Sequence, residues 1–384
     1  MKRFLYILLF LFAYCRLQAQ HVYFPFASRS ARDSVTQSLR KQIHETMRLP
    51  LQEATVPQWL GALWAMEIQL YRPPDFEKCI PVHLQVLPLL GMGMQRAYLQ
   101  MLYTLYPGMF VKAVAALLPR LQGNKNKALA LEYLQQAGYS APLLLDSAFL
   151  HSDFYRLHKQ FHAKTQQPQL TKDAFLHADF LKGEDVIVSF QHRNRNYPGY
   201  LQLRMAGGSW LKDSSGEDLQ FPQLARSITN LPYYLTNGNT PQGLYRIIGF
   251  DTSTNLWIGP TTNLQLVLPF EKADLPFFEA GTDAEAQYRQ LLGPFSGYTD
   301  LWESFEAGRI GRTEIIAHGT TIDPAFYKGQ PYWPHTPSLG CLCSPEWWGD
   351  NGLRERSVQE AWMQYIRNGT VQPRWLLVVE VSDL

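Results

Sequence analysis

A thiol and an imidazole in the C-terminal third of the chain supply the residue types needed for nucleophilic catalysis. Cys341 follows residues 338–340, which read Ser-Leu-Gly, and His318 follows the apolar run at residues 315–317. A Gly directly before a Cys lets the backbone turn tightly, so that neighbouring N–H groups can converge on an oxyanion. An imidazole can take the thiol proton across the fold, whatever the separation of the two residues in sequence. The pair predicts Cys341 as a nucleophile and His318 as its general base.

A third motif upstream gives this pair a family context. Residues 240–245 read Thr-Pro-Gln-Gly-Leu-Tyr and resemble the T-P-x-G-x-[FY] stretch that opens the catalytic domain of L,D-transpeptidases (YkuD-type), which cross-link bacterial peptidoglycan through a catalytic Cys. The His-Gly-Thr at residues 318–320 and the Ser-x-Gly-Cys follow in the family's order. Leu339 replaces the His of the usual [ST]-H-G-C motif, and Cys343 stands where the family usually carries Arg or Asn.

The resemblance implies an exported cysteine-dependent acyltransferase acting on peptidoglycan stem peptides. Cys341 would attack the carbonyl before the terminal D-Ala of a stem tetrapeptide, His318 would take the thiol proton and return it to the leaving amine, and N–H groups of residues 339–341 would hold the oxyanion. Passage of the thioester to an amine of a neighbouring stem is transpeptidation, and passage to water is carboxypeptidase action. The resemblance implies no cofactor, because neither ATP nor a metal takes part.

Neighbouring residues are candidates for support and for substrate contact. Thr320 and Ser338 could orient the imidazole or hydrogen-bond substrate, next to Gly319 and the turn residues Leu339 and Gly340. The aromatic segment 332–337 suits one wall of a substrate groove, with packing inside its own loop as the alternative. The residues expected to contact substrate are Tyr332, Trp333, His335 and Arg312, the last as partner of a stem-peptide carboxylate.

Other uses of these residues compete with acyl transfer. A cysteine hydrolase would use the same pair on a wall amide or another amide without an amine acceptor. Leu339 keeps open a non-catalytic exported scaffold with a degenerate catalytic domain, in which the Cys is buried and inert. Zinc binding by Cys341, Cys343, His318 and His335 is chemically reasonable, but one C-x-C pair without a second is poor spacing for a tetrahedral site. Cys343 is therefore expected as a small core residue.

Composition and the N-terminus favour an exported globular protein. The 384 residues are 46% apolar and 18% charged, enough for two or three domains, and the net charge of +2 gives no argument for a nucleic-acid partner. A basic start is followed by an apolar run at residues 4–14 that is too short to span a bilayer. Residues 1–19 are therefore expected to be a signal peptide cleaved after Ala19, which also removes Cys15. The alternative is a lipoprotein anchored at Cys15, which Tyr14 disfavours because a small residue is wanted directly before the lipidated Cys. The mature chain is expected in the periplasm or cell envelope, with no stable membrane span.

The elements that position the pair predict an α+β fold. Apolar residues at helical spacing over residues 27–139 predict four to six helices with breaks at Pro81 and other turn residues, so residues 20–150 are expected to form an all-helical domain that could bind a protein partner. Residues 151–182 are expected to be a mixed linker, and 183–384 a mostly β, L,D-transpeptidase-like catalytic domain with helical insertions. Strands are expected at residues 186–190, 200–204, 244–249, 264–268, 313–317 and 375–381, helices at 283–292 and 357–366, and an insertion at 270–311.

Overall fold

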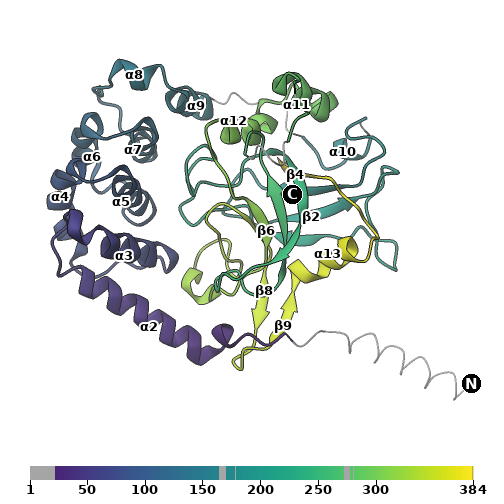
Figure 1. The fold of residues 1–384 in the computed structure, drawn as a ribbon, viewed down its shortest axis with the longest axis horizontal. Helices are drawn as coiled ribbons and strands as arrows, with labels where there is room; N and C mark the ends of the chain where they lie inside the picture. Colours follow the sequence, from purple (N-terminus) through teal and green to yellow (C-terminus); the bar gives the residue numbers. More distant parts are fainter. Residues whose placement is uncertain (1–21, 164–169, 178, 272–276, 280, 383) are drawn as a thin grey trace, which may run out of the picture.

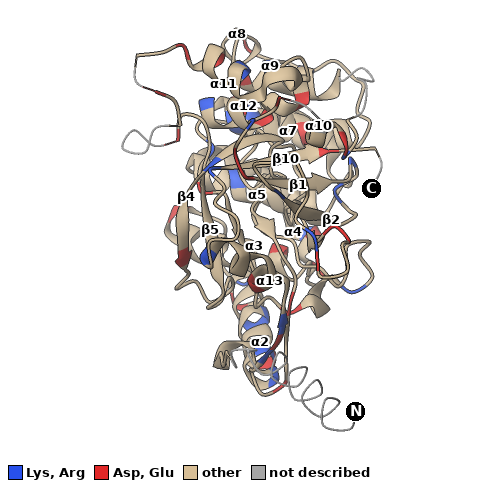
Figure 2. Cartoon of the chain, turned by 90° about the vertical axis from the view of Figure 1, so that its right-hand side faces the viewer, with Lys and Arg blue, Asp and Glu red and all other residues tan. Residues whose placement is uncertain are grey.

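The structure is a computed structural model that describes residues 22–163, 170–177, 179–271, 277–279, 281–382 and 384. The expected signal peptide and Cys15 lie outside these ranges. An N-terminal helical region is followed by a large barrel-like sheet, so the coarse α+β expectation is confirmed (Figure 1). None of the described helices combines the length and the apolar character needed to cross a membrane. Figure 2 shows Lys and Arg interspersed with Asp and Glu, in keeping with the small net charge.

Six α-helices occupy residues 29–136, a stretch that the structure describes in full, as their apolar spacing predicts. Ser28 begins the first of them by accepting a hydrogen bond from the Ala31 N–H, which satisfies one of the free N–H groups of the first turn. The helices follow one another in an arc along one side of the sheet (Figure 1). Their bounds are α2 (Arg29–Thr46), α3 (Val56–Ile68), α4 (Phe76–Val86), α5 (Met92–Leu105), α6 (Val111–Leu117) and α7 (Asn124–Gln136).

The expected helix break at Pro81 is wrong, because Pro81 lies inside α4. A proline here removes the hydrogen bond that its N–H would make to the carbonyl four residues earlier. Pro81 and Glu77 are both exposed, so water can satisfy the freed carbonyl and the helix continues. The helical region also extends beyond residue 150, since α8 (Ser147–Leu150) is followed by α9 (Asp153–His162) inside the expected mixed segment.

Within the described residues, eight strands form one sheet in the order β3-β2-β1-β10-β4-β5-β6-β7. The pairs β1–β10 and β6–β7 are parallel and the others antiparallel. All six expected strands are present, although the one expected at residues 313–317 begins later, after Glu314 with its positive φ of 62°. The bounds are β1 (Val186–Gln191), β2 (Gly199–Arg204), β3 (Phe221–Gln223), β4 (Gly243–Thr252), β5 (Thr262–Val267), β6 (Ile316–His318), β7 (Leu342–Cys343) and β10 (Trp375–Glu380).

The ends of this sheet meet at the predicted nucleophile. Leu224 directly follows β3 at one edge, and it exchanges two backbone hydrogen bonds of 2.8 and 2.9 Å with Cys343 of β7 at the other edge. This contact closes the sheet into a barrel-like form two residues after Cys341.

The predicted helices at residues 283–292 and 357–366 are confirmed. The remaining α-helices and strands of the described residues are α10 (Ala174–His177), α11 (Ala284–Leu292), α12 (Glu303–Arg309), α13 (Val358–Arg367) and the hairpin of β8 (Glu346–Trp348) and β9 (Arg354–Ser357), and short 3-10 helices lie between several elements.

The helical region packs directly on the β region. One apolar cluster contains residues of α3, α5 and α7 together with Leu235 and Leu264 of the β part. Polar contacts cross the same boundary, since the Gln100 amide donates to the Thr236 carbonyl at 2.6 Å and the Tyr327 hydroxyl donates to the Ile68 carbonyl at 2.9 Å. The helices are therefore placed to contribute side chains to sites on the sheet.

Candidate active site

Two adjacent parallel strands bring the predicted thiol and imidazole to one pocket. β6 ends at His318, and β7 begins directly after Cys341. Their register pairs Ala317 with Leu342 and His318 with Cys343. Cys341 and His318 both line a cavity of about 580 Å³. Neither residue is near the other in sequence, and the β6–β7 pairing alone brings them to the same cavity.

The surroundings of His318 make its imidazole a neutral base. The side chain is 6% exposed, and its Nδ1 is hydrogen-bonded to the Gly319 carbonyl. A carbonyl can only accept, so Nδ1 carries the proton and Nε2 is left with a free lone pair. Burial lowers the pKa of His318 below its ordinary value, which keeps the ring unprotonated at neutral pH.

The Cys341 thiol rests as a protonated group beside the main chain of β6. Its sulfur lies 3.6 Å from the Glu314 carbonyl oxygen, and the hydrogen bonds of the described residues include none between this thiol and His318. Burial raises the pKa of Cys341, while the Ile316 N–H and the Arg312 charge act in the opposite direction. At neutral pH the thiol is therefore protonated, and its hydrogen bond is directed to Glu314 and not to His318. Catalytic hydrogen bonds often tighten only once substrate is bound.

The turn at residues 338–341 is held by the side chain of Ser338, its first residue, and by Thr240 from a distant segment. The Ser338 hydroxyl donates to the Cys341 carbonyl at 2.8 Å and accepts from the Gly340 N–H at 3.0 Å. Gly340 has a φ of +117°, and a Cβ there would lie 2.6 Å from the Gly238 oxygen, so only glycine fits. Thr240, the first residue of the T-P-x-G segment, donates to the Gly340 carbonyl at 3.0 Å. Two motifs separated in sequence thus form one structural unit.

These hydrogen bonds reduce the number of N–H groups in the turn that are available to bind an oxyanion. The Gly340 N–H is already bonded to Ser338, so the expectation that it holds the oxyanion is wrong, and its contribution is conformational. In the described part of the chain, the N–H groups of Leu339 and Cys341 have no acceptor. Leu339 is 45% exposed, and Leu339 and Cys341 both line the cavity. These two groups are the available donors of the turn.

Replacing Leu339 by Pro should slow acylation of Cys341, because proline removes one of these two donors. Loss of one oxyanion donor costs on the order of 3 kcal/mol of transition-state stabilisation, which is roughly 10²-fold in rate. Single-turnover acylation by a β-lactam measures the effect. Leu339→Ala is the matched control, since it keeps the N–H and should react within a few-fold of the unmodified chain. Equal rates for the Pro and Ala variants would show that the turn does not hold the oxyanion.

Gly319 and Thr320 support the site from behind. A Cβ on Gly319 would collide with the Glu346 carboxylate, and the Thr320 N–H donates to Glu346 Oε2 at 3.0 Å. Glu346 is buried, and burial raises its pKa to about 7. Of the described residues, those that line the cavity include neither Gly319 nor Thr320, which places Thr320 behind His318 and not on the cavity wall. Glu346 was not anticipated, because nothing in sequence connects it with His318.

Arg312 lines the cavity but is not free to bind a substrate carboxylate. Its guanidinium donates to the carbonyls of Gly238 at 2.6 Å and Asn239 at 2.8 Å, and also to that of Tyr233. Burial lowers its pKa to about 10. The five donors of a guanidinium suit several carbonyls at once, and this use prevails over the expected substrate contact. Arg312 positions the loop beneath Gly340 and places positive charge near the Cys341 sulfur.

The aromatic segment 332–337 lies outside the cavity lining, and its Tyr332 packs partly against a distant segment of the chain. Tyr332 is fully buried against Tyr327 and Leu224, because enclosing a large ring removes much apolar surface from water. Trp333 is 48% exposed, and both buried ring nitrogens of His335 lack a hydrogen-bond partner within the described residues. Of the residues that the structure describes, those lining the cavity exclude all three, so the structure does not bring Tyr332, Trp333 or His335 to the wall of this cavity.

The thiols do not assemble into the zinc site considered from sequence. Cys79, Cys341 and Cys343 are all free. Cys343 is 2% exposed, and burial raises its pKa to about 12, as expected for an inert core thiol. Among the described residues, the single group of His, Cys, Asp and Glu side chains with converging ligand atoms lies elsewhere, in the helical region.

The helical region supplies one wall of the cavity. Trp64 and Ile68 of α3 line it, and the Trp64 ring packs edge-on against Trp257 with centroids 5.5 Å apart. From sequence, Trp64 was expected on the buried face of a helix, because it fits the helical spacing of the apolar residues around it. That period identifies the buried face of a helix without showing whether a protein core or a cavity lies opposite.

The pH dependence of the Cys341 reaction should show an acid limb below pH 6.5. The reaction requires neutral His318, so the rate falls as the pH drops through the pKa of His318, which burial places below its ordinary 6.5. A second rise is expected above pH 9, where the thiol ionises without help, because its pKa is raised above 9.0. Alkylation by iodoacetamide across this range measures both limbs. The acid limb should disappear in His318→Ala, and a half-loss above pH 7 in the unmodified chain would contradict the assignment.

Comparison with known proteins returns no match to this chain among protein-family models, curated proteins or solved structures.

Proposed function

We propose that this chain is an exported, cysteine-dependent acyltransferase of the L,D-transpeptidase type that acts on peptidoglycan stem peptides in the periplasm or cell envelope. The supporting observation is that Cys341 and His318, predicted from motif order as nucleophile and base, line one cavity, with His318 at the end of β6 and Cys341 directly before the adjacent β7. The Thr240 hydrogen bond to the nucleophile turn adds support, since it gives the third motif of the resemblance a physical role.

The proposed reaction proceeds through a thioester. Nε2 of His318 takes the Cys341 proton, and the sulfur attacks the carbonyl that precedes the terminal D-Ala. The N–H groups of Leu339 and Cys341 hold the oxyanion, and the imidazolium then gives its proton to the leaving D-Ala amine. An acceptor amine then attacks the thioester while His318 takes the amine proton and passes it to the departing sulfur, which forms the new amide and returns the free thiol.

The cavity lining is suited to a peptide. Asn237, Asn255 and Gln265 line the cavity with amide groups. Each already makes one hydrogen bond inside the chain, to Gln100, Trp257 and Asn263 in turn, and an amide has further donor and acceptor positions that a peptide backbone can use. Trp64 and Trp257 provide an aromatic surface against which a sugar or an extended peptide can pack. Since Trp64 comes from α3, the proposal gives the helical region a part in substrate binding as well as a possible surface for a protein partner.

Incubation with purified disaccharide-tetrapeptide tests the proposal, with the products read by mass spectrometry. Transpeptidation yields a cross-linked dimer that has lost one D-Ala, and hydrolysis yields the tripeptide. If only the tripeptide forms at a high concentration of acceptor, and no dimer, the protein is a carboxypeptidase and not a transferase. If neither product forms and a carbapenem, an inhibitor class of the resembled family, adds no mass to the reduced protein, the chain is a non-catalytic scaffold.

A further inference from the structure

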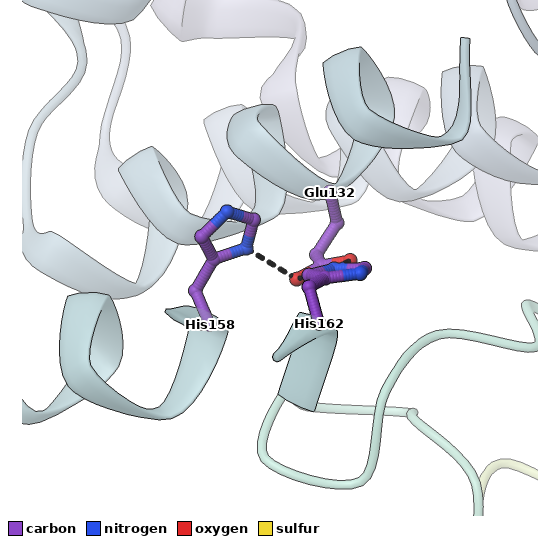
Figure 3. Close-up of side chains that lie close together, drawn as sticks. All are labelled: Glu132, His158 and His162. Carbon is purple, nitrogen blue, oxygen red and sulfur yellow. Dashed lines mark hydrogen bonds and ion pairs between the residues drawn. The ribbon is translucent and has the colours of Figure 1, made fainter. Parts of the chain in front are cut away.

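A second cluster of reactive side chains lies in the helical region, away from the cysteine cavity. Glu132 of α7 faces His158 and His162 of α9, and both rings point at its carboxylate (Figure 3). His158 Nδ1 lies 2.7 Å from Oε1 of Glu132, and His162 Nε2 lies 2.9 Å from Oε2. The two histidines are four residues apart on one helix, so they share a face. All the candidate ligand atoms lie within 4.8 Å of one another.

The cluster places a carboxylate where an isolated charge is costly. Glu132 is 2% exposed, and its hydrogen bonds within the described residues come from the two imidazoles and the Tyr234 hydroxyl. A carboxylate removed from water needs positive charge as well as donors. The ion-pair partners of Glu132 in the described chain are the two imidazoles, which supply positive charge only when protonated. A divalent cation held between the three side chains would take the place of the two ring protons that now face the carboxylate and would provide that charge with both rings neutral.

One side of the cluster opens onto a cavity. Glu132 and His162 line a pocket of about 540 Å³, together with Tyr103, Arg193 and Glu303. None of the residues that line this pocket lines the cysteine cavity. Zinc sites with three protein ligands and an accessible fourth position commonly bind water or a substrate oxygen there. Two imidazole nitrogens and one carboxylate oxygen are a ligand set that zinc accepts.

We propose that Glu132, His158 and His162 bind a Zn²⁺ ion whose fourth position faces the 540 Å³ pocket and takes water or an anionic oxygen ligand. Tyr234 does not bind the ion in this arrangement. Its hydroxyl donates a hydrogen bond to Glu132 and so orients the carboxylate that does. The ion would join α7 to α9. The site is independent of the acyl-transfer proposal, since it shares no residue with the cysteine cavity.

The test is titration of the chelator-treated full chain with Zn²⁺ against a chromogenic competitor, followed by absorption spectroscopy of the Co²⁺ form. One equivalent of Zn²⁺ is expected, and Co²⁺ should give tetrahedral d–d bands without thiolate charge-transfer absorption. His162→Ala should weaken binding by at least roughly 10²-fold. The matched control is His151→Ala, because His151 is an exposed histidine bonded to the Ser147 carbonyl in the neighbouring helix.

Two variants separate the site from its alternatives. His158→Gln keeps a hydrogen-bond donor toward Glu132 but removes the imidazole ligand, so it should fold and still lose zinc affinity. The double variant Cys341→Ser, Cys343→Ser should keep full affinity. Failure of the unmodified chain to bind Zn²⁺ at micromolar free ion would show that the cluster is only a hydrogen-bonded hub. Zinc binding that persists in His162→Ala and disappears in the cysteine double variant would show that the cysteines bind the metal. Either this result or the absence of binding overturns the proposal.

Discussion

Cys341→Ala should abolish covalent adduct formation with a carbapenem, and Cys341→Ser should leave at most a trace. The sulfur is the only atom of this side chain that can form a thioester, and a hydroxyl in the same turn is a far weaker nucleophile at neutral pH than a thiol. Intact-protein mass spectrometry of the unmodified chain should show one adduct, with its mass on the peptide that contains residue 341. The same variants should form neither the cross-linked dimer nor the tripeptide from the stem substrate.

Cys343→Ser is the matched control for this loss. Cys343 lies two residues after Cys341, at the end of β7, is 2% exposed and contacts the Thr336 hydroxyl at 3.7 Å. A buried thiol with a pKa of about 12 is inert, so its replacement should leave most of the activity at a similar melting temperature. Equal loss of activity from both cysteine variants, in proteins that remain folded, would remove the assignment of Cys341 as nucleophile.

His318→Ala should slow acylation of Cys341 by roughly 10²- to 10⁴-fold, the usual effect of losing a positioned base. The resting thiol is protonated, since burial raises its pKa, and the hydrogen bond from Nδ1 to Gly319 leaves Nε2 as the proton acceptor. Stopped-flow acylation at neutral pH measures the loss. The variant should recover toward the unmodified rate above pH 9, where hydroxide ionises the thiol directly.

Chemical rescue distinguishes a base from a structural histidine. Added imidazole can enter the 580 Å³ cavity and should restore part of the His318→Ala rate, with a dependence on the pH that tracks free imidazole. His335→Gln is the control, because His335 precedes the same turn in sequence but lies outside the cavity. An unrescued His318→Ala variant with altered melting behaviour would indicate that His318 serves folding alone.

Local patterns predicted the elements well where one physical preference dominates. The six strand runs are rich in β-branched and alternating residues, and each overlaps an observed strand. Asp283 and Ser357, which were placed at the start of two predicted helices, are their N-caps and accept hydrogen bonds from the first-turn N–H groups. The short strands β3, β7, β8 and β9 were not predicted, because two to four residues carry too little periodicity to be distinguished from loop.

The chemistry of individual side chains was less accessible from sequence. Arg312 was expected to bind a carboxylate and instead donates to main-chain carbonyls of a loop more than 70 residues earlier. The Glu132 cluster was missed because one ligand comes from α7 and two from α9, and His-x-x-x-His on an amphipathic helix has no distinctive meaning without the facing carboxylate. In both cases the partner is brought near only by packing between distant elements.

The sequence by itself determined the residue types and their order: a Cys after a glycine turn, a His after an apolar strand, a Thr-Pro-x-Gly segment upstream, and a helical half before a β half. These follow from local steric and periodic preferences, which act within a few residues. Tertiary structure alone decided that Thr240 fastens the turn, that Gly340 gives its N–H to Ser338, and that α3 closes the cavity beside Cys341. Such contacts depend on strand register and on helix packing against the sheet, where many weak apolar contacts act together and no single segment encodes the outcome.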